Sequence, residues 1–218
     1  IELGGNSDIL YRWGNPQNYG RGNEDNRVLY GNHGVNEILS GYPGENNILI
    51  FNNNADMYNL NSHVLEIIAP IDNFGNYYLA DNEPFGPYAS EWRYIDGFYS
   101  GKQSGAFRLP NGNTLITSAT EGYIFEVTND GEIVWEFRAS GDNTRINRAQ
   151  KYDLNYFINL GDINNDEVIN VLDIVLLSRF ILELEIPTDL EFRICDYNSD
   201  EVLNVLDIVS IVSIILNI

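Results

Sequence analysis

One acidic loop of twelve residues occurs twice near the C-terminus and constrains the fold more than any other part of the sequence. The segment from Asp162 to Asp173 recurs from Asp196 to Asp207, so the two copies lie 34 residues apart. Both copies place oxygen-bearing side chains at loop positions 1, 3, 5, 9 and 12, whereas the valine at position 7 offers only its backbone carbonyl. This is the donor pattern of a calcium loop, in which a hard cation takes about six to eight oxygen ligands.

The sequence therefore predicts two Ca²⁺ sites. The expected ligands of the first are Asp162, Asn164, Asp166, Val168, Asn170 and Asp173. The expected ligands of the second are Asp196, Asn198, Asp200, Val202, Asn204 and Asp207. Both copies have a glutamate at position 6, Glu167 and Glu201, where such loops usually have the glycine that allows a sharp turn. Two alternatives stay open. In one, the strained backbone at position 6 weakens calcium binding; in the other, the added carboxylate offsets that loss.

Charge and length limit the functions open to the chain. Its 218 residues are enough for one or two domains with an ordinary core. The net charge of −20 argues against nucleic acid and anionic membrane surfaces as partners, because an acidic field repels both. No apolar run reaches the roughly 18 residues of a membrane helix, so we expect no membrane insertion. The single cysteine, Cys195, excludes an internal disulfide.

Short apolar and aromatic runs separated by Gly and Asn turns fill the first 150 residues and predict β-strands. The expected strands are residues 9–13, 28–30, 34–39, 47–51, 63–68, 91–94, 104–109, 114–118, 123–127, 132–137 and 146–152. Tight turns join the four strands from 104 to 137 into an antiparallel meander. An earlier copy of its last three strands covers residues 46–51, 63–67 and 75–79, and residues 8–13 match the end of a third copy.

Recurring four-stranded units predict an all-β propeller fragment of about two and a half antiparallel blades. A closed propeller needs about four to eight blades, so we expect the chain to begin in mid-propeller. After each calcium loop the apolar spacing becomes helical, over residues 171–182 and 205–216, and no helix is expected before either loop. The predicted domains are residues 1–158, the partial propeller, and 159–218, a small α-helical domain with two calcium loop–helix repeats.

Residues 160–218 resemble a type I dockerin, on the strength of the segments 161–166, 171–179, 195–200 and 205–210. The resemblance implies calcium-dependent folding and docking onto a cohesin module. It also implies attachment of a secreted protein to an extracellular, polysaccharide-degrading complex, at the surface or in the periplasm of a bacterium. In dockerins, loop positions 10 and 11 help to recognise the cohesin; here they are Val171, Leu172, Val205 and Leu206. The alternative is that these residues belong to the core of two small helices.

Residues 1–158 resemble the C-terminal part of a bacterial arylsulfotransferase propeller, on the strength of the segments 8–16, 31–36, 44–53, 109–118 and 131–137. The resemblance implies sulfuryl transfer from an aryl sulfate to a phenol through a sulfo-histidine. It assigns the nucleophile to His33, although Asn32 stands where the family has Gln. The family's other site residues belong to earlier blades, so we expect this portion alone to be nearly inert. His63 receives no role.

Three readings stay open. The first is an exported arylsulfotransferase-like enzyme with a dockerin, in which His33 is catalytic. The second is a non-catalytic propeller that binds a ligand, in which His33 is a structural strand residue. The third treats the calcium module as purely structural, stabilising the C-terminus of a surface protein.

Overall fold

The computed structural model describes residues 9–54, 60–141, 144–153 and 156–217. The chain divides into two compact units, Ile1–Lys151 and Tyr152–Ile218. This division follows the contacts between residues, and the functional boundary predicted between residues 158 and 159 stays a prediction. Within the described residues no helix is long and apolar enough to cross a membrane.

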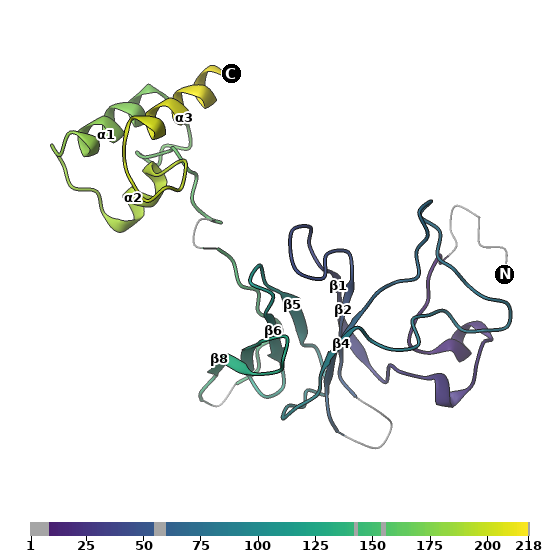
Figure 1. Ribbon diagram of the computed structural model, residues 1–218. Helices are drawn as coiled ribbons and strands as arrows, with labels where there is room; N and C mark the ends of the chain where they lie inside the picture. Colours follow the sequence, from purple (N-terminus) through teal and green to yellow (C-terminus); the bar gives the residue numbers. More distant parts are fainter. Residues whose placement is uncertain (1–8, 55–59, 142–143, 154–155, 218) are drawn as a thin grey trace. The chain divides into compact units, whose positions relative to one another are not determined.

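In the part of the first unit that the structure describes, eight strands form two four-stranded antiparallel sheets (Figure 1). The strands of the first sheet, in spatial and chain order, are β1 (Asn32–Glu37), β2 (Ile48–Asn52), β3 (His63–Ile67) and β4 (Trp92–Tyr94). Those of the second are β5 (Gly105–Arg108), β6 (Thr114–Ser118), β7 (Tyr123–Val127) and β8 (Ile133–Arg138). Two short 3₁₀ helices, Pro16–Tyr19 and Glu24–Asn26, precede β1. The β-rich architecture is therefore confirmed, while closure into a propeller stays a prediction.

Both faces of the first sheet are covered, which explains why apolar residues occupy both faces of its central strands. Phe51 and Val64 belong to a core that includes Ile116 and Phe125 of the second sheet. Ile50 and Leu65 point to the other face, where Tyr11, Trp13 and Leu29 pack on them. Burial of each such side chain contributes about 1.5–3 kcal/mol to folding.

Three predicted strands are wrong. Residues 9–13, 28–30 and 146–152 form no ladder. The first segment is fixed through side chains, because Tyr11 Oη donates to Gly86 O at 2.8 Å and Trp13 Nε1 to Pro87 O at 2.8 Å. The last segment is attached to β6 by isolated hydrogen bonds, such as the one from Ala149 N to Thr117 Oγ1 at 3.0 Å.

The internal repeat also ends differently from the prediction. The strand that pairs with β3 is β4, with Val64 opposite Tyr94, and not residues 75–79. The latter segment takes part only in an isolated bridge between Ile71 and Tyr77. The long connection from β3 to β4 explains the error, because the Gly–Asn turn inside it imitates the turn before β8.

A buried ion pair joins the two sheets. Arg108 of β5 donates through Nη2 to Glu66 of β3, and the two side chains are 4% and 6% exposed. Asn47 Nδ2 donates to the other carboxylate oxygen at 2.6 Å, and Arg108 Nη1 donates to Gly112 O at 2.8 Å. The Arg108 guanidinium also lies 5.2 Å from the ring centre of Trp92. Burial lowers the pKa of Arg108, while the negative charge of Glu66 opposes that shift.

The described residues of the second unit form three helices, α1 (Val171–Ile181), α2 (Asp189–Cys195) and α3 (Val205–Leu216). The first and third confirm the two predicted helices. The second corrects the expectation that no helix precedes a loop, because α2 leads directly into the loop at Asp196. All three helices contribute to one core, which includes Leu177, Phe180, Ile194, Cys195 and Ile211.

Candidate functional sites

The two end carboxylates of the first acidic loop hold the loop closed. Asp162 is buried and accepts hydrogen bonds from the backbone N–H groups of Asp166 at 3.1 Å and Glu167 at 2.9 Å. Asp173 is fully buried and accepts from Ile163 N at 2.8 Å and Asn164 N at 3.2 Å. Positions 1 and 12 are thus brought together around the turn.

The second loop repeats this geometry bond for bond. Asp196 accepts from Asp200 N at 3.0 Å and Glu201 N at 2.9 Å. Asp207 accepts from Tyr197 N at 3.0 Å and Asn198 N at 3.4 Å. The sequence repeat is therefore a structural repeat, and the same physical reasoning applies to both copies.

The last positions of each loop also start the helix that follows. Asn170 caps α1, because its Oδ1 accepts from Leu172 N at 2.8 Å while Asp173 accepts from Asn170 N at 2.8 Å. Asn204 and Asp207 form the same capping box on α3. Such reciprocal caps satisfy two backbone donors that a helix start leaves unpaired. Loop positions 9 and 12 therefore serve the helix as well as the predicted ion.

The donor chemistry of each loop suits Ca²⁺. Three carboxylates, two side-chain amides and one backbone carbonyl make an all-oxygen set, which hard cations prefer. Within the described parts of the chain no three His, Cys, Asp or Glu groups form a metal-sized cluster. A calcium loop draws about half of its donors from amide and carbonyl oxygens, so this does not exclude one. The twelve ligands stay predictions.

The glutamates at position 6 have the left-handed backbone that glycine usually provides. Glu167 has φ 68° and Glu201 has φ 63°. This conformation turns their N–H groups toward Asp162 and Asp196. A non-glycine residue there costs about 1–2 kcal/mol. The strain expected from the sequence is therefore present in both loops, and the effect of the added carboxylates on calcium affinity stays open.

Cys195 lies immediately before the second loop and is fully buried. Burial raises the pKa of its thiol to about 12, and the neighbouring Glu191 carboxylate adds to the shift. A protonated, buried thiol is a poor nucleophile. Cys195 is therefore a residue of the helical core.

His33, the predicted nucleophile, lies at an irregularity of β1. The register with β2 shifts between Asn32 and Gly34, so His33 is the extra residue of a bulge. Its side chain is exposed, and its Nδ1 lies 2.8 Å from Asn53 Oδ1. Sequence reasoning missed Asn53, because nothing local to either residue predicts a contact across 20 positions. The role of His33 stays a prediction.

His63, to which the sequence assigned no role, begins β3 and lines an open cavity of about 660 Å³. Trp13, Arg27, Trp92 and Arg93 are among the other lining residues. This cavity lies on the face of the first sheet that Trp13 partly covers. His33 is not among its lining residues.

Comparison with known proteins identifies one segment of the chain. Residues 160–216 match the family model described as the Dockerin type I domain. No curated protein and no solved structure matches the chain. No finding supports the resemblance of the first unit to arylsulfotransferases, which stays a hypothesis. The second unit, with its twin loop–helix repeats, therefore contains a type I dockerin domain, a calcium-binding domain that attaches proteins to extracellular or cell-surface complexes through a cohesin.

Proposed function

We propose that the second unit docks the chain onto a cohesin through an apolar surface that occurs twice, once at the start of α1 and once at the start of α3. The observation that carries this proposal is the exposure of six apolar side chains at equivalent positions. They are between 52% and 63% exposed: Val171, Leu172, Val175, Val205, Leu206 and Val209. Soluble domains seldom leave such side chains grouped and uncovered without a partner.

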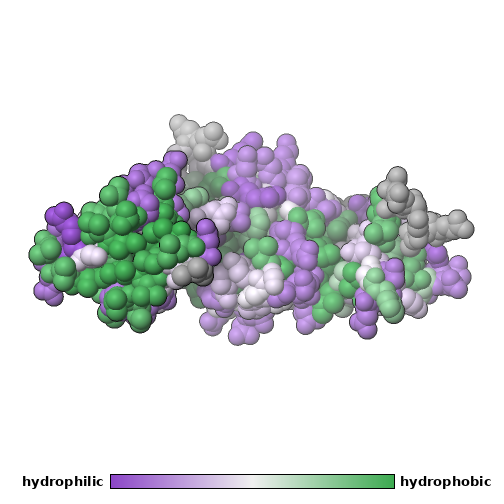
Figure 2. Space-filling model, turned by 90° about the horizontal axis from the view of Figure 1, so that it is seen from above, coloured by the Kyte–Doolittle hydropathy of each residue, from purple (hydrophilic) through white to green (hydrophobic). Residues whose placement is uncertain are grey.

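The exposure supports the reading in which loop positions 10 and 11 face a cohesin over the reading in which they belong to the core. The core faces of the helices are formed instead by Leu177 and Phe180 of α1 and by Ile211 of α3. Val171 and Leu172 lie on the opposite, solvent-facing side of α1. Figure 2 shows an extensive apolar surface, in green, over the second unit. These residues are therefore free to contact a partner rather than to fill the core.

Each loop positions its own half of this surface. Asn170 and Asn204 cap the helices, so Val171 and Val205 are held at the first helical position. The proposal includes one Ca²⁺ in each loop, bound by the six ligands predicted for that loop. Calcium would supply the positive charge that lets the carboxylates of each loop stay close together. Calorimetric titration with Ca²⁺ should then give a stoichiometry of two.

Aspartate substitutions test the surface. Val171→Asp with Leu172→Asp removes one copy, and Val205→Asp with Leu206→Asp removes the other; an acidic residue in the first helical turn is tolerated. Because the copies are alike, either pair alone should leave affinity within a few-fold of the wild type. All four changes together should weaken cohesin binding by about 100-fold or more. The measurement is surface binding to a panel of cohesin modules in saturating calcium.

Ile186→Asp is the matched control, since Ile186 is apolar and exposed but lies between α1 and α2. It should bind like the wild type. Wild-type affinity of the fourfold variant would disprove the proposed surface. Complete loss of binding from one pair alone would confine the surface to that helix.

A second candidate function, sulfuryl transfer by the first unit, is favoured by the position of His33. Its ring is exposed at a β-bulge, and one edge is held by Asn53. Bulges commonly redirect side chains next to active sites. In the proposed reaction, Nε2 attacks sulfur, the bond from sulfur to the aryl oxygen breaks, and a phenolate leaves. A phenolic acceptor then takes the sulfuryl group from the histidine.

The test uses the longest natural form of the protein and a chromogenic aryl sulfate with a phenolic acceptor. His33→Ala should lower turnover by at least about 1,000-fold, because no covalent intermediate could form. Turnover that is unaffected by this change would disprove the role of His33. Absence of turnover in the unaltered protein would favour the alternative function, a non-catalytic binding unit carried by the dockerin.

A further inference from the structure

Asn53 is the most thoroughly fixed side chain near His33. It follows β2 directly and is 1% exposed. Its side-chain Nδ2 donates to two backbone carbonyls, Ser100 O at 2.6 Å and Gln103 O at 3.1 Å. The backbone carbonyl of Asn53 accepts a hydrogen bond from Ser62 Oγ at 2.9 Å. The side-chain NH₂ group and the backbone carbonyl of Asn53 therefore both have defined hydrogen-bond partners.

These two carbonyls determine which way the amide points. A carbonyl oxygen can only accept, so both acceptors require the NH₂ group of Asn53 on their side. The reversed amide would bring Oδ1 against two carbonyl oxygens and leave three acceptors facing one another. The Oδ1 atom must therefore face His33, 2.8 Å from Nδ1. Because Oδ1 is only an acceptor, Nδ1 must carry the proton.

We propose that Asn53 is a positioning residue that fixes His33 in the tautomer protonated on Nδ1, which leaves the lone pair of Nε2 directed away from Asn53. This assignment concerns the tautomer and holds whether or not the protein transfers sulfuryl groups. Its catalytic value rests on the second candidate function. There, a neutral ring would already have its free lone pair on the nitrogen that attacks.

The backbone around this pair is arranged to hold it in place. A Cβ atom on Gly34, next to His33, would lie 2.9 Å from Gly105 Cα, so β1 approaches the start of β5 this closely because residue 34 is glycine. Gln103 and Ser104 have φ values of 54° and 82°. Two successive left-handed residues are costly for side chains larger than glycine, and such strain is retained where the surrounding structure enforces it. This turn carries the Gln103 carbonyl that orients Asn53.

Asn53 would also favour the charge that the ring gains during reaction. When Nε2 forms a bond to an electrophile, the imidazole becomes a cation that still carries its proton on Nδ1. The Oδ1 atom of Asn53 then accepts a charge-assisted hydrogen bond, which is stronger than the neutral one. No proton has to move for this to happen. The contact therefore orients the ring before the reaction and stabilises it afterwards.

Nitrogen NMR of ¹⁵N-histidine-labelled protein tests the tautomer directly. The chain has only 2 histidines, so His63→Gln assigns the spectrum. At a pH where the ring is neutral, we expect Nδ1 of His33 to show the shift of a protonated nitrogen and Nε2 that of an unprotonated one. The opposite pattern, or averaged shifts in the wild-type protein, would overturn the proposal.

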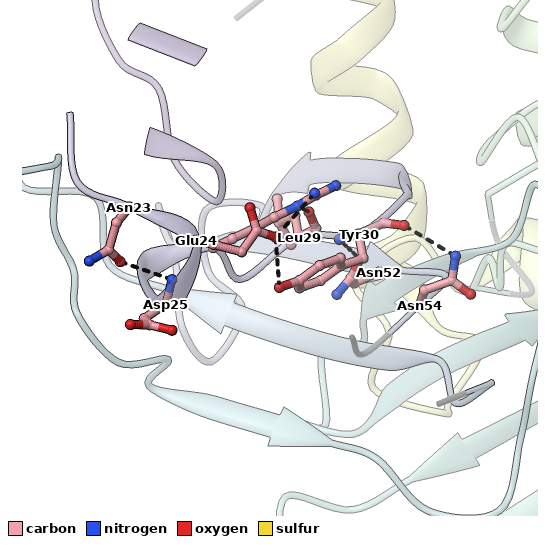
Figure 3. A network of polar contacts seen from close by, with 8 residues as sticks. Asn23, Glu24, Asp25, Leu29, Tyr30, Asn52 and Asn54 are labelled. Carbon is pink, nitrogen blue, oxygen red and sulfur yellow. Dashed lines mark hydrogen bonds and ion pairs between the residues drawn. The ribbon is translucent and has the colours of Figure 1, made fainter. Parts of the chain in front are cut away.

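Asparagine variants separate positioning from stability. Asn53→Ala should allow both tautomers, seen as averaged shifts, because it removes the acceptor that faces Nδ1. The controls are Asn52→Ala and Asn54→Ala, which remove amides bound to Tyr30 and not to His33 (Figure 3). They should leave the tautomer unchanged. An unchanged tautomer in folded Asn53→Ala would contradict the proposal, and if that variant does not fold, the wild-type spectrum decides.

Where sulfuryl transfer is observed, Asn53→Ala should lower kcat by about 100-fold with little change in KM. This result is distinct from failure of the candidate function. A protein without sulfuryl transfer can still have His33 fixed in the Nδ1–H tautomer, and an active protein with a mixed tautomer would contradict only the role of Asn53.

Discussion

Removal of calcium is expected to unfold the helices of residues 160–216 while the two sheets of the first unit stay folded. Each twelve-residue loop contains four carboxylates, namely Asp162, Asp166, Glu167 and Asp173 in the first and their counterparts in the second. Without a cation their mutual repulsion opposes loop closure, so the binding free energy of the metal becomes folding free energy. Addition of a chelator should abolish most of the helical circular dichroism, and added Ca²⁺ should restore it.

Cys195 provides a second readout of the same transition. It is the only cysteine and is fully buried in the helical core. Its reaction with a thiol reagent should be slow in calcium and at least about 100-fold faster in chelator, because unfolding exposes the thiol. Asp173→Ala should produce fast labelling even in moderate calcium. The control Asp189→Ala, an exposed acidic residue outside the loops, should behave like the wild type. Identical labelling rates with and without calcium would refute the calcium loops.

Replacement of Arg108 by Met is expected to destabilise the first unit by about 3–5 kcal/mol, because it leaves the Glu66 carboxylate buried without its partner. Neutralising both groups, with Glu66→Gln added, should recover a large part of the loss. The measurement is urea denaturation followed by tryptophan fluorescence.

Lys151→Met is the matched control for Arg108→Met. Lys151 also pairs with a buried glutamate, Glu126, but its own side chain is 54% exposed. Glu126 keeps hydrogen bonds from Asn111 and Asn113 in that variant. The loss should therefore stay below about 1 kcal/mol. Equal losses of stability from the two substitutions would show that the buried Arg108–Glu66 pair contributes no more than the Lys151–Glu126 pair.

The turns of the two acidic loops and their exiting helices could be predicted from the sequence because their information is local. Asn170 and Asp173 act within three residues of each other, and their pattern predicts both a cap and a ligand set. The meander of β5 to β8 was predictable for the same reason, since each strand pairs with its neighbour in the chain across a tight turn.

Most of the errors and omissions involve longer-range or competing signals. Residues 9–13 have the composition of a strand, yet Tyr11 and Trp13 cover the first sheet instead of extending it. The contact between His33 and Asn53 depends on where two loops converge. The helix α2 is different, because a local signal was present: Thr188 and Glu191 form a capping box. Its seven residues were too few for the apolar spacing to identify it.

The four carboxylates in each loop affect when the protein becomes able to attach to a partner. A chain with four acidic side chains per loop should remain unfolded at its C-terminus wherever free calcium is scarce, as in a cytoplasm. It should fold once it reaches a medium rich in that ion. If the protein is exported, the Val171 and Val205 surfaces would form only outside the producing cell, and premature assembly with a partner would be avoided without any separate inhibitor.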